Sequence, residues 1–104
     1  MENFGRIVLE QRKKLQISQK DLAASIRKED GSSISPQYLN DIERGRRNPP
    51  PEYIIKQLAE KLNLTEDYLF YLAGKLPDDI EGDFSSERVE AAMKLFRRTL
   101  HEDK

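Results

Sequence analysis

Apolar residues recur at helical spacing in several stretches of the chain, and polar segments rich in turn residues separate these stretches. The pattern predicts helices over residues 3–15 and 51–62, and another helix that begins after the cap residue Ser18. A further helix is expected between Thr65 as its cap and Gly74 as its stop. Its residues expected to face inward are Tyr68, Leu69 and Leu72. The chain is therefore predicted to be all-α.

The segment from Ser35 to Gly45 carries signals for both ends of one more, short helix. Ser35 is suited to cap the first backbone N–H groups, Pro36 fits the first helical position, and Gly45 provides a left-handed stop. Leu39 and Ile42 share one side at helical spacing and are expected to face the core. The side that points away from the core is polar and presents Pro36, Gln37, Asn40, Asp41 and Arg44.

An arginine cluster surrounds Gly45, where the chain leaves this helix: Arg44, Arg46 and Arg47. Guanidinium groups form charge-assisted, often bidentate hydrogen bonds with phosphates, so the cluster is suited to hold phosphates beside a helix inserted into a DNA groove. The alternative is an ordinary amphipathic surface helix with solvated charges. The grouping of the arginines favours DNA.

Read with Gln19, Leu22 and Ala23 upstream, the pattern ISQKDLA…ISPQYLNDIERGRRNPP resembles the Xre/Cro-type helix-turn-helix repressors of bacteria and phages. The resemblance extends from about Phe4 to Leu76. It requires, in order, a glutamine that opens one helix, a Leu-Ala pair within it, a capped recognition helix and a Glu-x-Gly stop. The resemblance implies a five-helix repressor-like domain that binds double-stranded DNA.

The resemblance and the chemistry of the side chains together give an expected DNA-binding site. Amides are suited to adenine and a carboxylate to the cytosine N4 group, whereas basic groups, hydroxyls and helix N-termini are suited to phosphates. The residues expected to read bases are Pro36, Gln37, Tyr38, Asn40 and Asp41. Those expected to hold phosphates are Ser18, Gln19, Lys20, Ser35, Arg44, Arg46 and Arg47.

Arg12 shares the apolar face of the first predicted helix with Phe4, Ile7, Val8 and Leu15. A partly buried arginine is tolerated only when it is paired and hydrogen-bonded. The family resemblance implies that its partner is Glu43, the glutamate two residues before Gly45. We therefore expect a structural ion pair between these two side chains.

The chain departs from the family pattern at Arg27–Ile34, which makes the turn about six residues longer than the usual ~3–4. Its composition, with Asp30-Gly31 followed by serines, is typical of a flexible turn. Either the second helix lengthens and the loop projects, or the two helices depart from their standard angle. We expect projection, because the cap and core positions on both sides are intact. Arg27 and Lys28 would then contact phosphates or belong to a solvated loop.

Beyond the predicted DNA-binding domain (residues 1–76), an acidic linker (77–84) leads to a C-terminal helix (85–104). Phe84 before its cap and Val89 after it can form a hydrophobic staple. One side of this helix carries an apolar stripe, Val89, Ala92, Met93, Phe96 and Leu100. Such a stripe must be buried, either on the same domain or against a second copy. We expect it to form the interface of a homodimer.

Net charge is only −1, but its distribution agrees with the motif. Residues 1–50 carry ten Lys/Arg against seven Asp/Glu, a balance of +3, and residues 51–104 carry eight against twelve, a balance of −4. The basic half therefore contains the predicted recognition helix. The acidic half leaves open a second function, an antitoxin or adaptor that mainly binds a regulatory protein partner.

Catalytic chemistry has little support in the sequence. His101 is the single histidine and there is no cysteine, so no zinc or iron ligand set is expected. No glycine-rich phosphate loop or nucleophile motif is present. We expect a non-enzyme without a cofactor. An apolar signal core and a membrane-length apolar run are also missing, so a cytoplasmic protein without membrane contact is expected.

Overall fold

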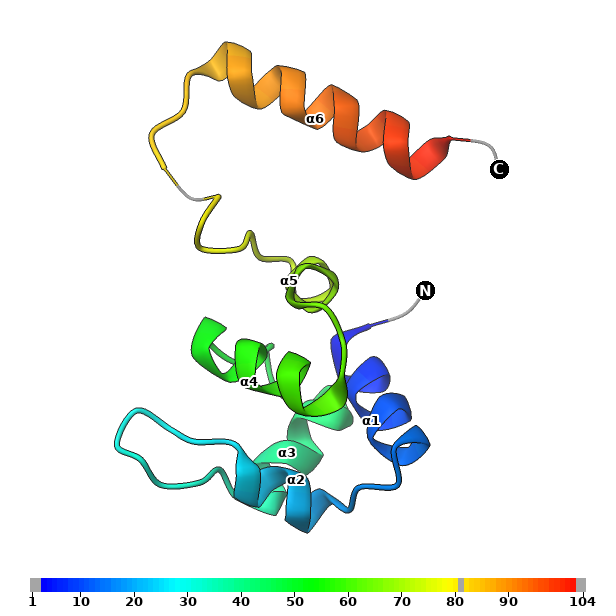
Figure 1. Ribbon diagram of the computed structural model, residues 1–104, viewed down its shortest axis with the longest axis vertical. Helices are drawn as coiled ribbons and strands as arrows, with labels where there is room; N and C mark the ends of the chain where they lie inside the picture. Colours follow the sequence, from blue (N-terminus) through cyan, green and yellow to red (C-terminus); the bar gives the residue numbers. More distant parts are fainter. Residues whose placement is uncertain (1–2, 81, 103–104) are drawn as a thin grey trace.

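The computed structural model describes residues 3–80 and 82–102, and within them it contains six helices and no strand beyond a single β-bridge. The helices are α1 (Phe4–Lys14), α2 (Gln19–Ser25), α3 (Pro36–Glu43), α4 (Glu52–Leu62), α5 (Glu66–Ala73) and α6 (Ser86–His101). The first five form one body and α6 lies apart from it (Figure 1). The predicted all-α fold, with five helices and an additional C-terminal helix, is confirmed.

Most helices begin at the cap that the sequence indicates. The side chains of Asn3, Ser18, Ser35, Thr65 and Ser85 each accept a hydrogen bond from the backbone N–H three residues later. α4 follows Pro51 and has no side-chain cap. Gly45 and Gly74 take left-handed φ angles of 72° and 70°, which end α3 and α5. The ends of the helices are thus determined mainly by local sequence.

The core lies between the first five helices, with α3 packed against both α1 and α2, and α4 against α5. Among the described residues, fifteen buried apolar ones form it: Phe4, Val8, Leu22, Ala23, Ile26, Ile34, Leu39, Ile42, Ile54, Ile55, Leu58, Ala59, Leu62, Leu69 and Phe70. Two expected inward positions are wrong, because Leu15 and Tyr68 are each 39% exposed. Leu15 caps the end of α1 and Tyr68 lies in the first turn of α5, beside the buried Leu69 and Phe70.

Gly5 allows α1 to pass close to the C-terminal end of α3. A Cβ atom at this position would collide with the carbonyl oxygen of Ile42 and lie 2.9 Å from that of Glu43. Any larger residue would therefore push α1 away from the helix that carries the predicted base-reading residues.

Residues 26–34 form a hairpin that projects from the body between α2 and α3 (Figure 1, cyan). The Ile34 N–H donates to the Ile26 carbonyl at 3.0 Å, and the Lys28 N–H donates to the Ser32 carbonyl at 2.7 Å. Ile26 and Ile34 are both buried, so the base of the hairpin belongs to the core. The segment projects as expected, but it is closed by hydrogen bonds rather than being the flexible turn that its composition indicates.

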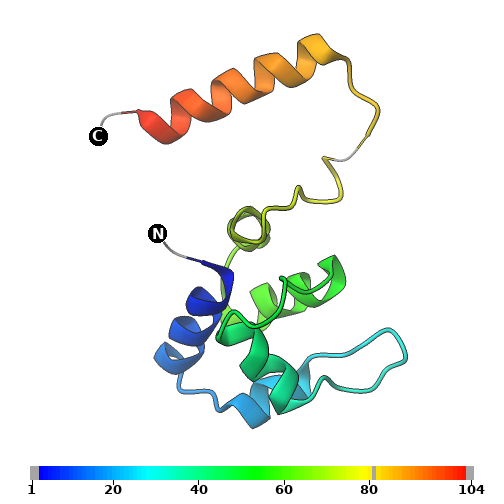
Figure 2. The ribbon, with the colours of Figure 1, turned by 180° about the vertical axis from the view of Figure 1, so that it is seen from behind.

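The chain after α5 first stays against the body and then leaves it. The ammonium group of Lys75 donates to the Pro50 carbonyl at 3.0 Å, and that of Lys56 pairs with Asp78 at 2.9 Å. The view from behind shows the remaining linker carrying α6 away from the other helices (Figure 2). No residue of α6 is buried. Within the described residues, no helix has the length and apolar character to span a membrane.

Candidate DNA-binding site

The predicted phosphate-contacting and base-reading residues come together at one end of the molecule, where α2 and α3 lie side by side (Figures 1 and 2). α3 buries Leu39 and Ile42 in the core. On its other sides Pro36, Gln37 and Arg44 are exposed, whereas Tyr38, Asn40 and Asp41 are half-buried. The polar surface of α3 is therefore accessible but already engaged in contacts within the protein.

The C-terminal end of α3 is fixed by a buried ion pair. The Nε and Nη2 atoms of Arg12 donate to the two carboxylate oxygens of Glu43 at 2.7 and 3.0 Å, and Nη1 donates to the Ile17 carbonyl at 2.9 Å. The two side chains are only 9% and 1% exposed. A bidentate, charge-assisted pair of this kind offsets the cost of burying both charges and restricts their orientation. It joins α1 and the α1–α2 loop to α3.

Gln19 lies at the start of α2 and also contacts α3. Its Nε2 atom donates to Asn40 Oδ1 at 3.0 Å and to Glu43 Oε1 at 2.9 Å. Both N–H groups of this amide are thereby used inside the protein, although the family resemblance implies a phosphate contact for Gln19. With its Oδ1 atom accepting, Asn40 keeps its own amide N–H groups as donors.

Asp41 connects the polar surface of α3 to the arginines that follow it. The Gln37 amide donates to Asp41 Oδ1 at 3.0 Å, and the guanidinium groups of Arg46 and Arg47 approach the same carboxylate at 3.8 and 3.5 Å. Both arginines are more than half exposed, so these ion pairs are weak and easily exchanged for other anions. Phosphates can take the place of Asp41.

Arg47 also stacks on the first turn of α3. Its guanidinium carbon lies 5.0 Å from the centre of the Tyr38 ring, within the range of a cation–π contact. Burial raises the pKa of the Tyr38 hydroxyl, against the opposing effect of Arg47. The hydroxyl is therefore protonated at neutral pH and available as a hydrogen-bond donor.

The chain also matches the model of a known protein family. The Xre/Cro-like family described as Helix-turn-helix matches residues 8–69, well over half of the chain. The chain belongs to this helix-turn-helix family. The match begins in α1 and ends in α5, so it includes α2, the hairpin and α3, whereas the linker and α6 lie outside it. Comparisons with curated proteins and with solved structures gave no match.

Membership of this family makes the protein a DNA-binding transcriptional regulator. α2 and α3 are the helices of its helix-turn-helix. Of the expected phosphate ligands, Lys20, Arg44, Arg46 and Arg47 are exposed, whereas the hydroxyls of Ser18 and Ser35 accept from the backbone N–H groups of Asp21 and Tyr38. These hydroxyls keep a proton to donate to another acceptor.

Two glutamines that support this helix-turn-helix domain are not apparent from the sequence. The Gln11 amide donates to the Leu62 carbonyl at 2.8 Å and joins α1 to the end of α4. Gln57 on α4 accepts from the Arg27 N–H at 2.7 Å and donates to the Arg27 carbonyl at 2.8 Å, which fixes the backbone at the start of the hairpin. Each pair is separated by at least thirty residues, and no sequence spacing predicts such partners.

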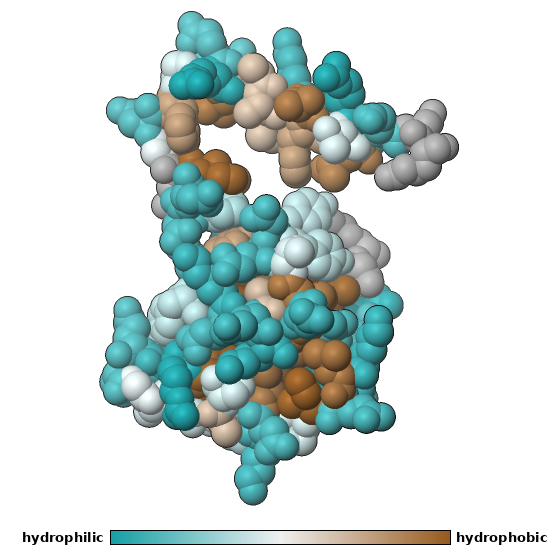
Figure 3. Space-filling model, in the orientation of Figure 1, coloured by the Kyte–Doolittle hydropathy of each residue, from teal (hydrophilic) through white to brown (hydrophobic). Residues whose placement is uncertain are grey.

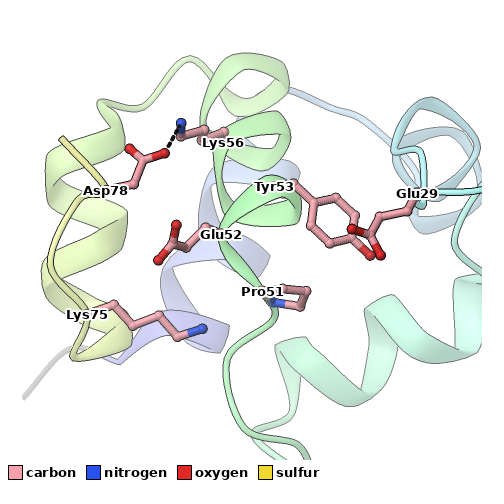
Figure 4. A pocket seen from close by; sticks show the side chains of 7 residues that line it. All are labelled: Glu29, Pro51, Glu52, Tyr53, Lys56, Lys75 and Asp78. Atoms are coloured by element: carbon pink, nitrogen blue, oxygen red, sulfur yellow. Dashed lines mark hydrogen bonds and ion pairs between the residues drawn. The ribbon is translucent and has the colours of Figure 1, made fainter. Parts of the chain in front are cut away.

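A hollow with a volume of about 670 Å³ lies on the α4 side of the hairpin. It is lined by residues of both charges: Glu29, Pro51, Glu52, Tyr53, Lys56, Lys75 and Asp78 (Figure 4). Lys56 and Asp78 pair with each other across it. Among the residues described, no group of three potential metal ligands is present. The polar surface of α2 and α3 thus remains the main candidate site.

Proposed function

We propose that this regulator is a repressor that binds a palindromic operator as a homodimer, with α3 of each copy in the major groove. The observation that supports this function is the exposed polar surface of α3, held in place by the buried Arg12–Glu43 pair and followed by arginines. A short capped helix of this kind fits a major groove, which is about 12 Å wide.

Base readout is assigned to Pro36, Gln37, Tyr38, Asn40 and Asp41. The amides of Gln37 and Asn40 are suited to the N6 and N7 atoms of adenine, and Asp41 is suited to accept from cytosine N4. Pro36 and Tyr38 supply apolar contact to a thymine methyl group or lie beside the backbone. Because Gln37 donates to Asp41 in the unbound protein, reading bases requires this hydrogen bond to open.

Phosphate contacts are assigned to two groups that flank α3. Ser18, Gln19 and Lys20 at the start of α2, with Ser35, form one group. Arg44, Arg46 and Arg47 after α3 form the other. In the proposed complex, DNA phosphates replace Asp41 as the partner of Arg46 and Arg47, and Asp41 becomes free to face a base.

The homodimer is assigned to α6. Four large residues of its stripe, Val89, Met93, Phe96 and Leu100, are between 42% and 56% exposed, and Ala92 is exposed between them. Figure 3 shows apolar side chains along this helix, separate from the core of the main body. Exposure of such a stripe to water is unfavourable, and a second copy of α6 would cover it.

A second candidate function rests on the same exposed stripe. An antitoxin or adaptor would use α6 to bind a different protein, with DNA binding as a secondary activity. Pull-down experiments and gel shifts with the full chain distinguish these functions, since a repressor requires only DNA and a second copy.

Selection of bound sites from random double-stranded DNA tests the main proposal. Enrichment of an inverted repeat with half-site centres about 34 Å apart is the expected result. Enrichment of a single half-site would contradict the homodimer, and no enrichment above the starting pool would contradict sequence-specific binding.

A further inference from the structure

A second, smaller hollow lies between the hairpin, the beginning of α3 and the loop that follows α3. Its volume is about 390 Å³. The residues that line it are Lys28, Ile34, Ser35, Tyr38, Arg47, Tyr53 and Ile54. The hairpin, the start of α3, the loop that follows α3 and the first turn of α4 each contribute a polar group to one concave surface. The hollow adjoins α3, because Ser35 caps this helix and Tyr38 lies in its first turn.

Two successive charged residues of the hairpin line different hollows. Lys28 lines the hollow beside α3, whereas the next residue, Glu29, lines the hollow beside α4 (Figure 4). Glu29 and Asp30 form the turn at the tip of the hairpin, where the Gly31 N–H donates to the Lys28 carbonyl at 3.0 Å. The cation faces the DNA-binding helix and the carboxylate faces away from it.

The chemistry of this hollow favours an anion. Lys28 and Arg47 provide positive charge, and the hydroxyls of Tyr38, Ser35 and Tyr53 provide neutral donors. Among the described residues that line it, none is acidic. Asp41 pairs with Arg47 from outside the lining, through an exposed contact of 3.5 Å that another anion can replace.

The hairpin fixes the backbone that carries Lys28 before any ligand binds. Gln57 fixes the backbone of the preceding residue, Arg27, through both its N–H and its carbonyl. Ile26 and Ile34 anchor the base of the hairpin in the core, and the Ile34 N–H closes it. A pre-organised cation loses less conformational freedom on binding than one on a mobile loop.

We propose that this hollow binds a phosphate of the DNA backbone, so that the hairpin is a second DNA-contacting element beside α3. This inference rests on the proposed insertion of α3 into the major groove. Phosphates border that groove on both sides, and the hollow lies at the end of α3 where the hairpin joins it. Lys28 and Arg47 hold the phosphate from two sides, and the Tyr38 hydroxyl donates to it.

The salt dependence of binding by Lys28→Ala tests this inference. Each phosphate contact contributes about 0.9 to the slope of log K against log salt concentration. We therefore expect the slope on random-sequence duplex DNA to fall, by up to about 0.9 per bound domain, since Arg47 stays beside the same phosphate in this variant. Lys61→Ala removes the same charge from an exposed position that lines neither hollow, and its slope should equal that of the wild type.

An unchanged slope for Lys28→Ala, in a protein that unfolds at the wild-type temperature, would overturn the phosphate site while leaving the proposed function intact. If the wild type binds no DNA, the proposed function itself fails, and the phosphate site fails with it. The two failures are therefore distinguishable.

A scan of the selected operator with single methylphosphonate substitutions locates the contact. Neutralising the phosphate bound in the hollow should weaken binding by the wild type more than binding by Lys28→Ala, in which only Arg47 and the Tyr38 hydroxyl still hold that phosphate. Lys28→Arg should respond like the wild type, because the charge is retained. If both the wild type and Lys28→Ala lose the same affinity at every position, no phosphate depends on Lys28 and the proposal is wrong.

Discussion

Glu43 is the residue at which α1, α2 and α3 meet, because it accepts from Arg12 and from Gln19. The same Gln19 amide holds Asn40, so the buried pair also orients a proposed base-reading side chain. The Arg12–Glu43 pairing follows from the family resemblance, and an arginine on an apolar face indicates that some partner is needed. The sequence does not predict the hydrogen bonds of Gln19 to α3, because a glutamine at the start of a helix can contact solvent, DNA or another helix without any difference in the sequence.

Glu43→Ala should destabilise the domain by about 3–5 kcal/mol, because Arg12 would remain buried without its partner. Chemical denaturation measures this loss. Glu10→Ala is the matched control, since Glu10 belongs to an exposed ion pair on α1 and its removal should cost at most about 1 kcal/mol. Equal losses in the two variants would contradict the structural role of the buried pair.

Gln37→Ala should weaken binding to the selected operator by ~1–3 kcal/mol and leave binding to random DNA nearly unchanged, because a base contact carries the sequence preference. Arg46→Ala should instead weaken binding to every sequence and lower the salt slope by about 1. Titrations of both variants on both DNAs distinguish the roles. A uniform loss for Gln37→Ala would argue against base readout by this amide.

At the scale of elements, the sequence predicts what local chemistry determines and misses what distant contacts determine. Helix ends are set locally by the caps Ser18 and Ser35, which bond to backbone groups only three residues away, and by the left-handed φ of Gly45. The sequence predicts that the hairpin projects, but it does not predict the hydrogen bonds that fix its backbone. These bonds include those of Gln57, which lies thirty residues from Arg27 in the sequence. Helical spacing predicts the polar surface of α3. The hollow beside it is not predictable from the sequence, because its lining comes from separate elements that only the fold brings together.

Shortening the hairpin distinguishes its tip from its base. Replacing residues 29–31 by Asn-Gly, a sequence that favours a two-residue hairpin turn, keeps Lys28 opposite Ser32 and should preserve the unfolding temperature and DNA affinity, because Ile26, Lys28 and Ile34 remain. The same replacement combined with Lys28→Ala should also leave a folded domain, but with the lower salt slope expected of Lys28→Ala. If the tip deletion abolishes DNA binding while the domain stays folded, the docking role belongs to residues 29–31 instead.

The whole molecule consists of a five-helix body of a DNA-binding family and the helix α6, which is not buried against this body. The chain after α5 is attached to the body through Lys75 and Asp78, and beyond Ile80 it leads to α6, in which every residue described is exposed. A small domain gains affinity chiefly by placing two copies on neighbouring half-sites, since the second contact becomes intramolecular. In the proposed homodimer, the apolar stripe of α6 would provide this coupling.

Truncation after Pro77 should therefore separate folding from function. The helices of the core are all retained, so we expect a folded five-helix domain that is monomeric in sedimentation. It should bind a full operator far more weakly than the intact chain, because the linked second binding event is lost. Binding to a single half-site should stay close to that of the intact chain, which provides the internal control.

Phe96→Asp tests the same interface without removing the linker. It places an unpaired charge in the proposed dimer contact, where the loss of burial and the cost of desolvation both oppose association. The monomer should fold normally, because Phe96 is 46% exposed and contributes nothing to the core. If this variant or the truncated chain still sediments as a dimer, α6 is not the dimer interface. If the intact protein is monomeric at concentrations that fill its operator, the stripe instead packs within one chain, and the affinity for paired half-sites must come from the five-helix body.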